Sequence, residues 1–275
     1  MSGGVNQRVL PGFGISLGYA IIYLSLLVLI PLVACLVKAA SLSPSEFLAA
    51  AWTPRAQAAY ALTFSVSFIA ATINVVLGTI VAWTLVRYRF PGRRIVDALV
   101  DIPLALPTAV AGLVYASLYV PQGWLGQFFA PLGIQVAYSR LGIVLVLVFT
   151  GFPFVVRTVQ PVLDDLDAEM EEASAVLGAS RWQTFRRVIL PTLISPVLTG
   201  FALAFARGLG EYGSVIFISS NKIFDTEIAP MLILVRLEEF AYAEAAAIAT
   251  VLLGFSFVLL AAINYLEWRS KRYGG

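Results

Sequence analysis

The sequence contains no histidine, a single cysteine and only 12% charged residues. Without histidine, the chain lacks the commonest metal ligand and the commonest general base of enzymes. One cysteine cannot form a disulfide within the chain. We therefore expect neither a metal site nor a histidine-dependent catalytic triad, and an intramembrane enzyme is disfavoured for the same reason.

Lysine is almost as scarce, which bears on how the protein obtains energy. The three lysines are Lys38, Lys222 and Lys271, and none of them follows a glycine. A phosphate-cradling P-loop needs Gly-Lys-Ser/Thr. The chain cannot bind ATP in that way, so if its action is driven by ATP, the ATPase is another polypeptide.

Apolar residues dominate what is present. They make up 60% of the 275 residues, against an ordinary 45–50%, and the mean hydropathy is +0.88. Six windows are long enough to cross a bilayer as helices, which need about 20 apolar residues each. These windows are residues 15–37, 58–86, 95–120, 140–163, 188–218 and 242–266. The sequence predicts an all-α integral membrane protein with six transmembrane helices.

The basic residues predict its orientation. Twelve lie on the side of the termini and five on the other, and lysine and arginine are enriched in cytoplasmic loops. We therefore expect cytoplasmic tails at 1–14 and 267–275, a first span with an external loop at 15–57, and a transmembrane domain at 58–266. In a bacterium this places the protein in the inner membrane with both termini cytoplasmic.

The polar segment between the fourth and fifth windows has the signals of two short helices. Asp167 suits an N-cap, and acidic residues follow it in the first turn. Gly178 suits the left-handed residue that ends a helix, and Ser180 with Gln183 forms a capping-box pattern. The pattern predicts helix, sharp bend, helix on the cytoplasmic side.

The second of these helices carries an apolar stripe. Trp182, Phe185 and Val188 or Ile189 recur at helical spacing among arginines. Periodicity alone leaves open whether the stripe docks on a partner or lies on the chain's own bundle or on lipid headgroups.

The full spacing of this segment resembles the cytoplasmic loop of the membrane subunits of bacterial ABC importers. The motif runs from Glu172, Ala173 and Ser174 through Gly178 to Leu190 and Pro191. Ser174 stands where alanine is usual, and Val188 where isoleucine is common. The resemblance implies the type I importer fold and docking to a separate ATPase subunit. The docking residues it implies, with the stripe, are Glu172, Ala173, Gly178, Trp182, Phe185, Leu190 and Pro191.

Two groups of residues inside the spans are candidates for the pathway or its gate. Arg207 and Glu211 are four apart, so on one helix they share a face and either neutralise each other structurally or belong to a gate. In the third window, Pro103 and Pro107 should kink the helix or make it start late. The carbonyls they free, with Thr108, either line a water-filled path or serve only packing.

A narrower resemblance covers roughly residues 58–266. The runs 101–112, 153–172, 182–191 and 201–219 are similar to the T permease subunits of bacterial sulfate/thiosulfate ABC importers. This resemblance implies a heterodimer with a second related permease, two ATPase subunits that bind ATP and Mg²⁺, and an external sulfate-binding protein. It implies no cofactor in this chain.

Other functions stay open at this point. Molybdate or tungstate uptake is the alternative within the same class, because tetrahedral dianions differ little. An ion-coupled secondary transporter would need titratable groups in mid-membrane, where only Arg207 and Glu211 are clearly placed. Cys35 ends a run similar to a lipoprotein cleavage box, but a retained first helix is the simpler interpretation.

Overall fold

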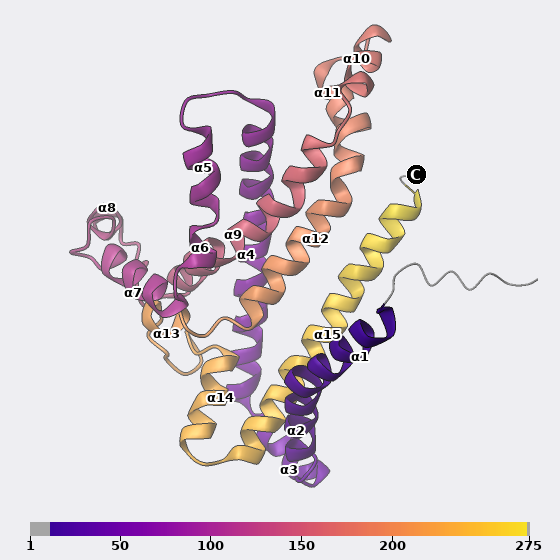
Figure 1. Ribbon diagram of the computed structural model, residues 1–275. Helices are drawn as coiled ribbons and strands as arrows, with labels where there is room; N and C mark the ends of the chain where they lie inside the picture. Colours follow the sequence, from indigo (N-terminus) through magenta and orange to yellow (C-terminus); the bar gives the residue numbers. More distant parts are fainter. Residues whose placement is uncertain (1–11, 274–275) are drawn as a thin grey trace, which may run out of the picture.

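A computed structural model describes residues 12–273, and the regular elements among them are all helices (Figure 1). Among the residues that the structure describes, five helical segments are long and apolar enough to cross a membrane. They are α1 (Phe13–Leu24) with a π-helical turn (Ser25–Leu29) and α2 (Ile30–Ala39); α4 (Pro54–Arg87); α9 (Arg140–Asp164); α11 (Arg181–Thr184) with a π-helical turn (Phe185–Ile189) and α12 (Leu190–Leu209); and α15 (Tyr242–Tyr273). The predicted all-α membrane fold is confirmed. Most of the expected N-terminal tail, residues 1–11, lies outside the described residues.

Shorter helices connect these spans. They are α3 (Pro44–Ala51), α5 (Arg93–Val100), α6 (Ile102–Ala105), α7 (Thr108–Tyr119), α8 (Gly126–Phe129) with a 3₁₀ turn (Ala130–Leu132), α10 (Ala168–Val176), α13 (Val215–Ile218) and α14 (Ala229–Glu238). One end of the bundle carries α10, α11 and the last turns of α15, and the other carries α3 and the end of α14 (Figure 1). We call these the α10 end and the α3 end.

Helices α4, α9 and α12 form the centre of the bundle. The central one is α9, whose apolar window is 61% buried against 33% for α4. Small residues allow the close approach: a Cβ on Gly200 of α12 would lie 2.9 Å from the Cα of Val155 on α9. Such small-residue contacts suit a membrane, where helices associate through packing rather than through hydrophobic burial.

The third apolar window is a broken span. Helix α5 ends at Val100, α6 is a single turn, and α7 begins only at Thr108. Leu106 and Pro107 between them are extended, with ψ of 133° and 132°. A residue before proline is disfavoured in the helical region, so the break falls at Leu106. The prediction that prolines kink or delay this helix is confirmed.

The fifth window extends too far at its C-terminal end. The helical segment that begins at Arg181 ends at Leu209, and the apolar residues beyond it form the separate α13. The chain turns at Gly210 and lays α13 against α7, where a Cβ on Gly112 would lie 2.2 Å from the Ser214 carbonyl oxygen. Because Gly112 has no side chain, the backbone at Ser214 can pack directly against α7.

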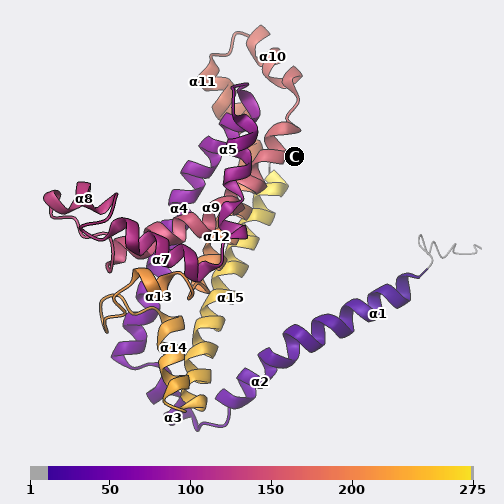
Figure 2. The same ribbon diagram turned by 60° about the vertical axis from the view of Figure 1, so that its left-hand side comes forward.

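The first span leans away from the bundle. None of its apolar window is buried, and it meets the rest of the chain mainly where α2 packs on α15 (Figure 2). The segment after it, which was expected to be an external loop, contains α3. Ser43 caps α3 through a capping box with Glu46, and Pro44 occupies its first turn, where proline is tolerated.

Candidate docking loop and membrane pathway

The predicted helix, bend, helix lies at the α10 end. The Asp167 side chain accepts a hydrogen bond from the Glu169 amide at 3.0 Å and caps α10. Gly178 has φ +83°, and the Ala179 amide donates to the Ser174 carbonyl at 3.0 Å. This is the Schellman arrangement that ends helices at glycine.

The second helix starts as predicted. The Ser180 hydroxyl accepts from the Gln183 amide at 3.3 Å, and the Gln183 side chain accepts from the Ser180 amide at 2.8 Å. Helix α11 then runs through a π-helical turn into α12. Pro191 lies in the first turn of α12, so the helix changes its hydrogen-bond pattern just before a residue that cannot donate.

The apolar stripe on this second helix divides into an exposed and a packed part. Trp182 is 66% exposed. Phe185 packs on Trp83 of α4, with ring centroids 6.0 Å apart, and Ile189 is buried in the central core. Only the Trp182 end of the stripe is therefore available to another molecule, while the other end fixes the loop to its own bundle.

Two apolar residues that the sequence analysis missed complete the exposed tip. Val176 and Leu177 close α10, and each is 87% exposed. Their signal in the sequence was a pair of aliphatic residues directly before the helix-ending Gly178, in an otherwise polar loop. With Trp182 they form what we call the loop tip.

The other predicted docking residues lie on the two sides of this tip along the chain, in α10 and at the start of α12. Glu172, Ala173, Leu190 and Pro191 are all exposed. Their neighbour Glu171 forms an ion pair with Arg87, the last residue of α4, and Arg87 lies 5.4 Å from the ring centroid of Trp83. The loop is thus attached to α4 as well as to α9 and α12.

The predicted pair Arg207 and Glu211 is formed, although the two residues do not lie on one helix. Arg207 is in the last turn of α12, and Glu211 follows the end of that helix. The Glu211 side chain is 1% exposed and the Arg207 side chain 33%. The Glu211 carboxylate also accepts from the Ser214 amide at 2.9 Å and the Ser214 hydroxyl at 2.8 Å, which satisfies a buried charge.

The structure places Thr108 against Gly213, two residues after Glu211. A Cβ on Gly213 would lie 2.2 Å from the Thr108 hydroxyl oxygen, so the first turn of α7 rests directly on the chain beside Glu211. Pro107 immediately precedes α7, and Pro103 lies in the first turn of α6. The broken third span and the end of α12 therefore meet at Thr108 and Gly213.

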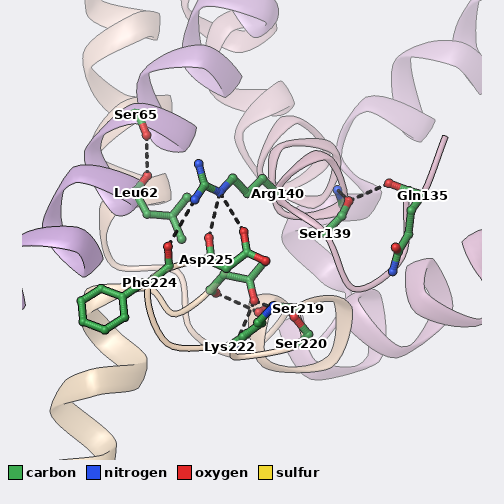
Figure 3. Close-up of polar contacts among 12 residues, drawn as sticks. Leu62, Ser65, Gln135, Ser139, Arg140, Ser219, Ser220, Lys222, Phe224 and Asp225 are labelled. Atoms are coloured by element: carbon green, nitrogen blue, oxygen red, sulfur yellow. Dashed lines mark hydrogen bonds and ion pairs between the residues drawn. The ribbon is translucent and has the colours of Figure 1, made fainter. Parts of the chain in front are cut away.

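The segment between α13 and α14 is held by charged contacts to two helices. Arg140 at the start of α9 donates to the Asp225 carbonyl at 2.8 Å and pairs with the Asp225 carboxylate at 3.3 Å (Figure 3). Arg55 at the start of α4 makes a bidentate contact to Glu227, at 2.6 and 2.8 Å. No group of three or more metal-ligating side chains occurs among residues 12–273.

Residues 74–269 match the family model of the binding-protein-dependent transport system inner membrane component. The chain belongs to this family of ABC transporter membrane subunits. It is 54% identical, over 92% of this chain and 88% of the relative, to the sulfate transport system permease protein CysT of a Synechocystis species. It is 48% identical, over 97% and 96%, to the CysT permease of Escherichia coli.

Solved structures agree on the fold. A bacterial ABC transporter that imports the acidic polysaccharide alginate superposes with a TM-score of 0.75 at 15% identity, over 92% of this chain and 94% of that one. An amino acid ABC transporter gives 0.53 at 19% identity, over 81% and 95%. These likenesses concern the fold alone.

Proposed function

We propose that this chain is a permease subunit of an ATP-driven importer of sulfate and thiosulfate. Two sulfate permeases match it over nearly its whole length, and they favour sulfate over molybdate or tungstate as the anion. The chain supplies half of the translocation path, and a second, related permease supplies the other half.

The observation that carries the proposal is the loop tip. Val176, Leu177 and Trp182 are exposed on a bend that is fixed by its caps and by its contacts to α4. Exposed aliphatic and aromatic side chains of this kind are typical anchors of protein interfaces. The tip docks into a separate ATPase subunit, two copies of which bind ATP and Mg²⁺.

The mechanism follows from the connections of the loop. Residues 165–167 join α9 to α10, and α11 continues into α12. When the two ATPase subunits close on ATP, α10 moves with them, and α9 and α12 tilt as levers. The path then opens first to the outside, where an external sulfate-binding protein delivers the anion, and to the inside after hydrolysis.

The orientation is part of the proposal. The α10 end faces the cytoplasm, because the basic residues concentrate in the loops at this end. The segment 219–228, fixed by Arg55 and Arg140, faces the outside. Both termini are then cytoplasmic, in the inner membrane.

Uptake of labelled sulfate by a strain that lacks this gene tests the substrate. We expect uptake to return when the gene is supplied with its partners, and excess unlabelled sulfate or thiosulfate to suppress it more strongly than molybdate. Stronger suppression by molybdate would contradict the assignment. The isolated chain should hydrolyse no ATP, and activity should appear only with an ATPase subunit and a second permease.

A further inference from the structure

Arg157, on α9, makes a saturated set of hydrogen bonds to the first part of the broken third span. Its Nε and one terminal nitrogen donate to the two carboxylate oxygens of Asp101, at 2.9 and 2.6 Å. The same terminal nitrogen donates to the Asp97 carbonyl at 2.8 Å. The other donates to the Asp97 carboxylate and to Gln160, both at 2.6 Å. All five N–H donors of the guanidinium are used.

This cluster, which we call the Arg157 clasp, is a poor site for the transported anion. A sulfate ion would find no free donor on the guanidinium. One guanidinium against two carboxylates also leaves a formal net charge of −1, which repels an anion. The clasp therefore acts on the chain itself.

Its position connects two parts that must move together. Arg157 lies two turns before the end of α9, and only residues 165–167 separate that end from α10. Asp97 is on α5, and Asp101 ends it. Helix α5 packs mainly on α6 and α9, and Val100 is its one buried residue. The clasp is thus the chief polar link between α9 and the first part of the third span.

The chemistry of the link suits the transfer of motion. A planar guanidinium held by a bidentate carboxylate and three further acceptors fixes orientation as well as distance. The break at Leu106 and Pro107 separates α5 and α6 from α7, so this part of the span can move relative to α7. Arg157→Lys would keep the positive charge but would lose the bidentate contact of the guanidinium to the Asp101 carboxylate.

We propose that Arg157 is a positioning residue that couples movement of the docking loop to the third span. The proposal rests on the proposed function, because it assumes that ATPase subunits move α10. When α9 tilts, the clasp carries α5 and α6 with it and so changes the width of the path at the α10 end. Without the clasp, the ATPase cycle proceeds and the third span does not follow.

The test uses the complete importer reconstituted in liposomes, with sulfate uptake and ATP hydrolysis measured on the same sample. We expect Arg157→Ala and Arg157→Lys to assemble and hydrolyse ATP, while sulfate carried per ATP falls about tenfold or more, within the range of ordinary coupling energies. The near-isosteric Asp101→Asn should also lower the amount of sulfate carried per ATP. The exchanged pair Arg157→Asp with Asp101→Arg should recover several-fold over Arg157→Asp alone. Unchanged sulfate per ATP in Arg157→Ala, Arg157→Lys and Asp101→Asn would overturn the proposal.

A second measurement needs no transport and separates the two proposals. With Cys35→Ser as background, spin labels are placed at Ile95 on α5 and Val258 on α15, both well exposed. In the otherwise unchanged importer we expect ATP to shift the distance between the labels, and Arg157→Ala to abolish the shift. If ATP shifts the distance between the labels equally in the otherwise unchanged importer and in Arg157→Ala, the proposed role of the clasp is overturned. Failure of the unsubstituted importer to carry sulfate, with the label shift still dependent on Arg157, would instead overturn the substrate assignment.

Discussion

Ser174 on α10 and Thr184 on α11 share a hydrogen bond of 2.7 Å between their hydroxyl oxygens, across the bend at Gly178. Ser174 also donates to the Glu171 carbonyl at 2.8 Å, so its hydroxyl belongs to both helices. An alanine at this position, which is usual in the motif, cannot make either bond. In this chain the angle between α10 and α11 therefore has an additional polar restraint.

Replacing Ser174 with alanine should loosen the bend slightly. Both hydroxyls are partly buried, so the lost hydrogen bond costs about 0.5–1.5 kcal/mol in local stability. Hydrogen exchange of amides in residues 168–184 should speed up by about fivefold. Thr184→Val should have a similar effect, and the double variant should add little, because both changes remove the hydrogen bond between the two hydroxyls. Full additivity would show that the hydroxyls act separately.

Replacing Gly178 with valine should uncouple transport while leaving membrane insertion intact. The φ of +83° costs an L-residue about 1–2 kcal/mol, and a β-branched side chain is among the worst tolerated there. No atom lies near the position of an added Cβ, so the cost comes from the backbone alone. Sulfate uptake should fall in Gly178→Val and persist in Gly178→Asn, because asparagine tolerates this conformation. Normal uptake by the valine variant would remove the bend from the docking mechanism.

The docking loop was predictable from sequence because its rules are local. Asp167, Gly178 and the pair Ser180 and Gln183 act within a few residues of themselves. The Arg157 clasp depends instead on pairing across 56 and 60 residues, which no spacing rule reveals.

The end of the fifth span was predicted wrongly because hydropathy alone does not mark where that helix stops. Residues 215–218 are as apolar as the helix before them, so hydropathy extends the span through them. What ends the helix is the three-dimensional fit at Gly112 and the burial of Glu211 against Ser214. Apolar composition reports that a segment avoids water, and it does not distinguish lipid from a neighbouring helix.

Replacing Leu177 with aspartate should weaken docking of the ATPase subunit without affecting folding. The side chain is 87% exposed, so stability should change by no more than about 0.5 kcal/mol. A charge in the centre of an apolar interface should cost about 2 kcal/mol or more, roughly a 30-fold rise in Kd. Affinity of the purified permease pair for the ATPase subunit measures this. Leu132→Asp, at a 70% exposed position after α8, is the control and should bind as the unsubstituted chain does.

Arg207 and Glu211 should respond unequally to single substitutions, because their burial differs. Arg207→Ala leaves a carboxylate whose side chain is 1% exposed without its cation, and breaking such a pair costs about 3–5 kcal/mol. Glu211→Ala leaves a guanidinium that is one-third exposed, so its cost should be smaller. Assembly with the partner subunits should therefore suffer more in Arg207→Ala, and thermal stability of the purified complexes measures the difference.

The double alanine variant separates a structural pair from a gate. If the pair only neutralises charge, removing both residues restores much of the stability and also transport. We expect assembly to recover while sulfate uptake per ATP stays low. The reason is that the pair lies where α12 ends and where the broken third span contacts the chain through Thr108 and Gly213, a junction that has to move if the path opens. Assembly, ATP hydrolysis and uptake compared in both single variants and the double variant decide the matter, and uptake at the level of the unsubstituted importer in the double variant would eliminate the gating role.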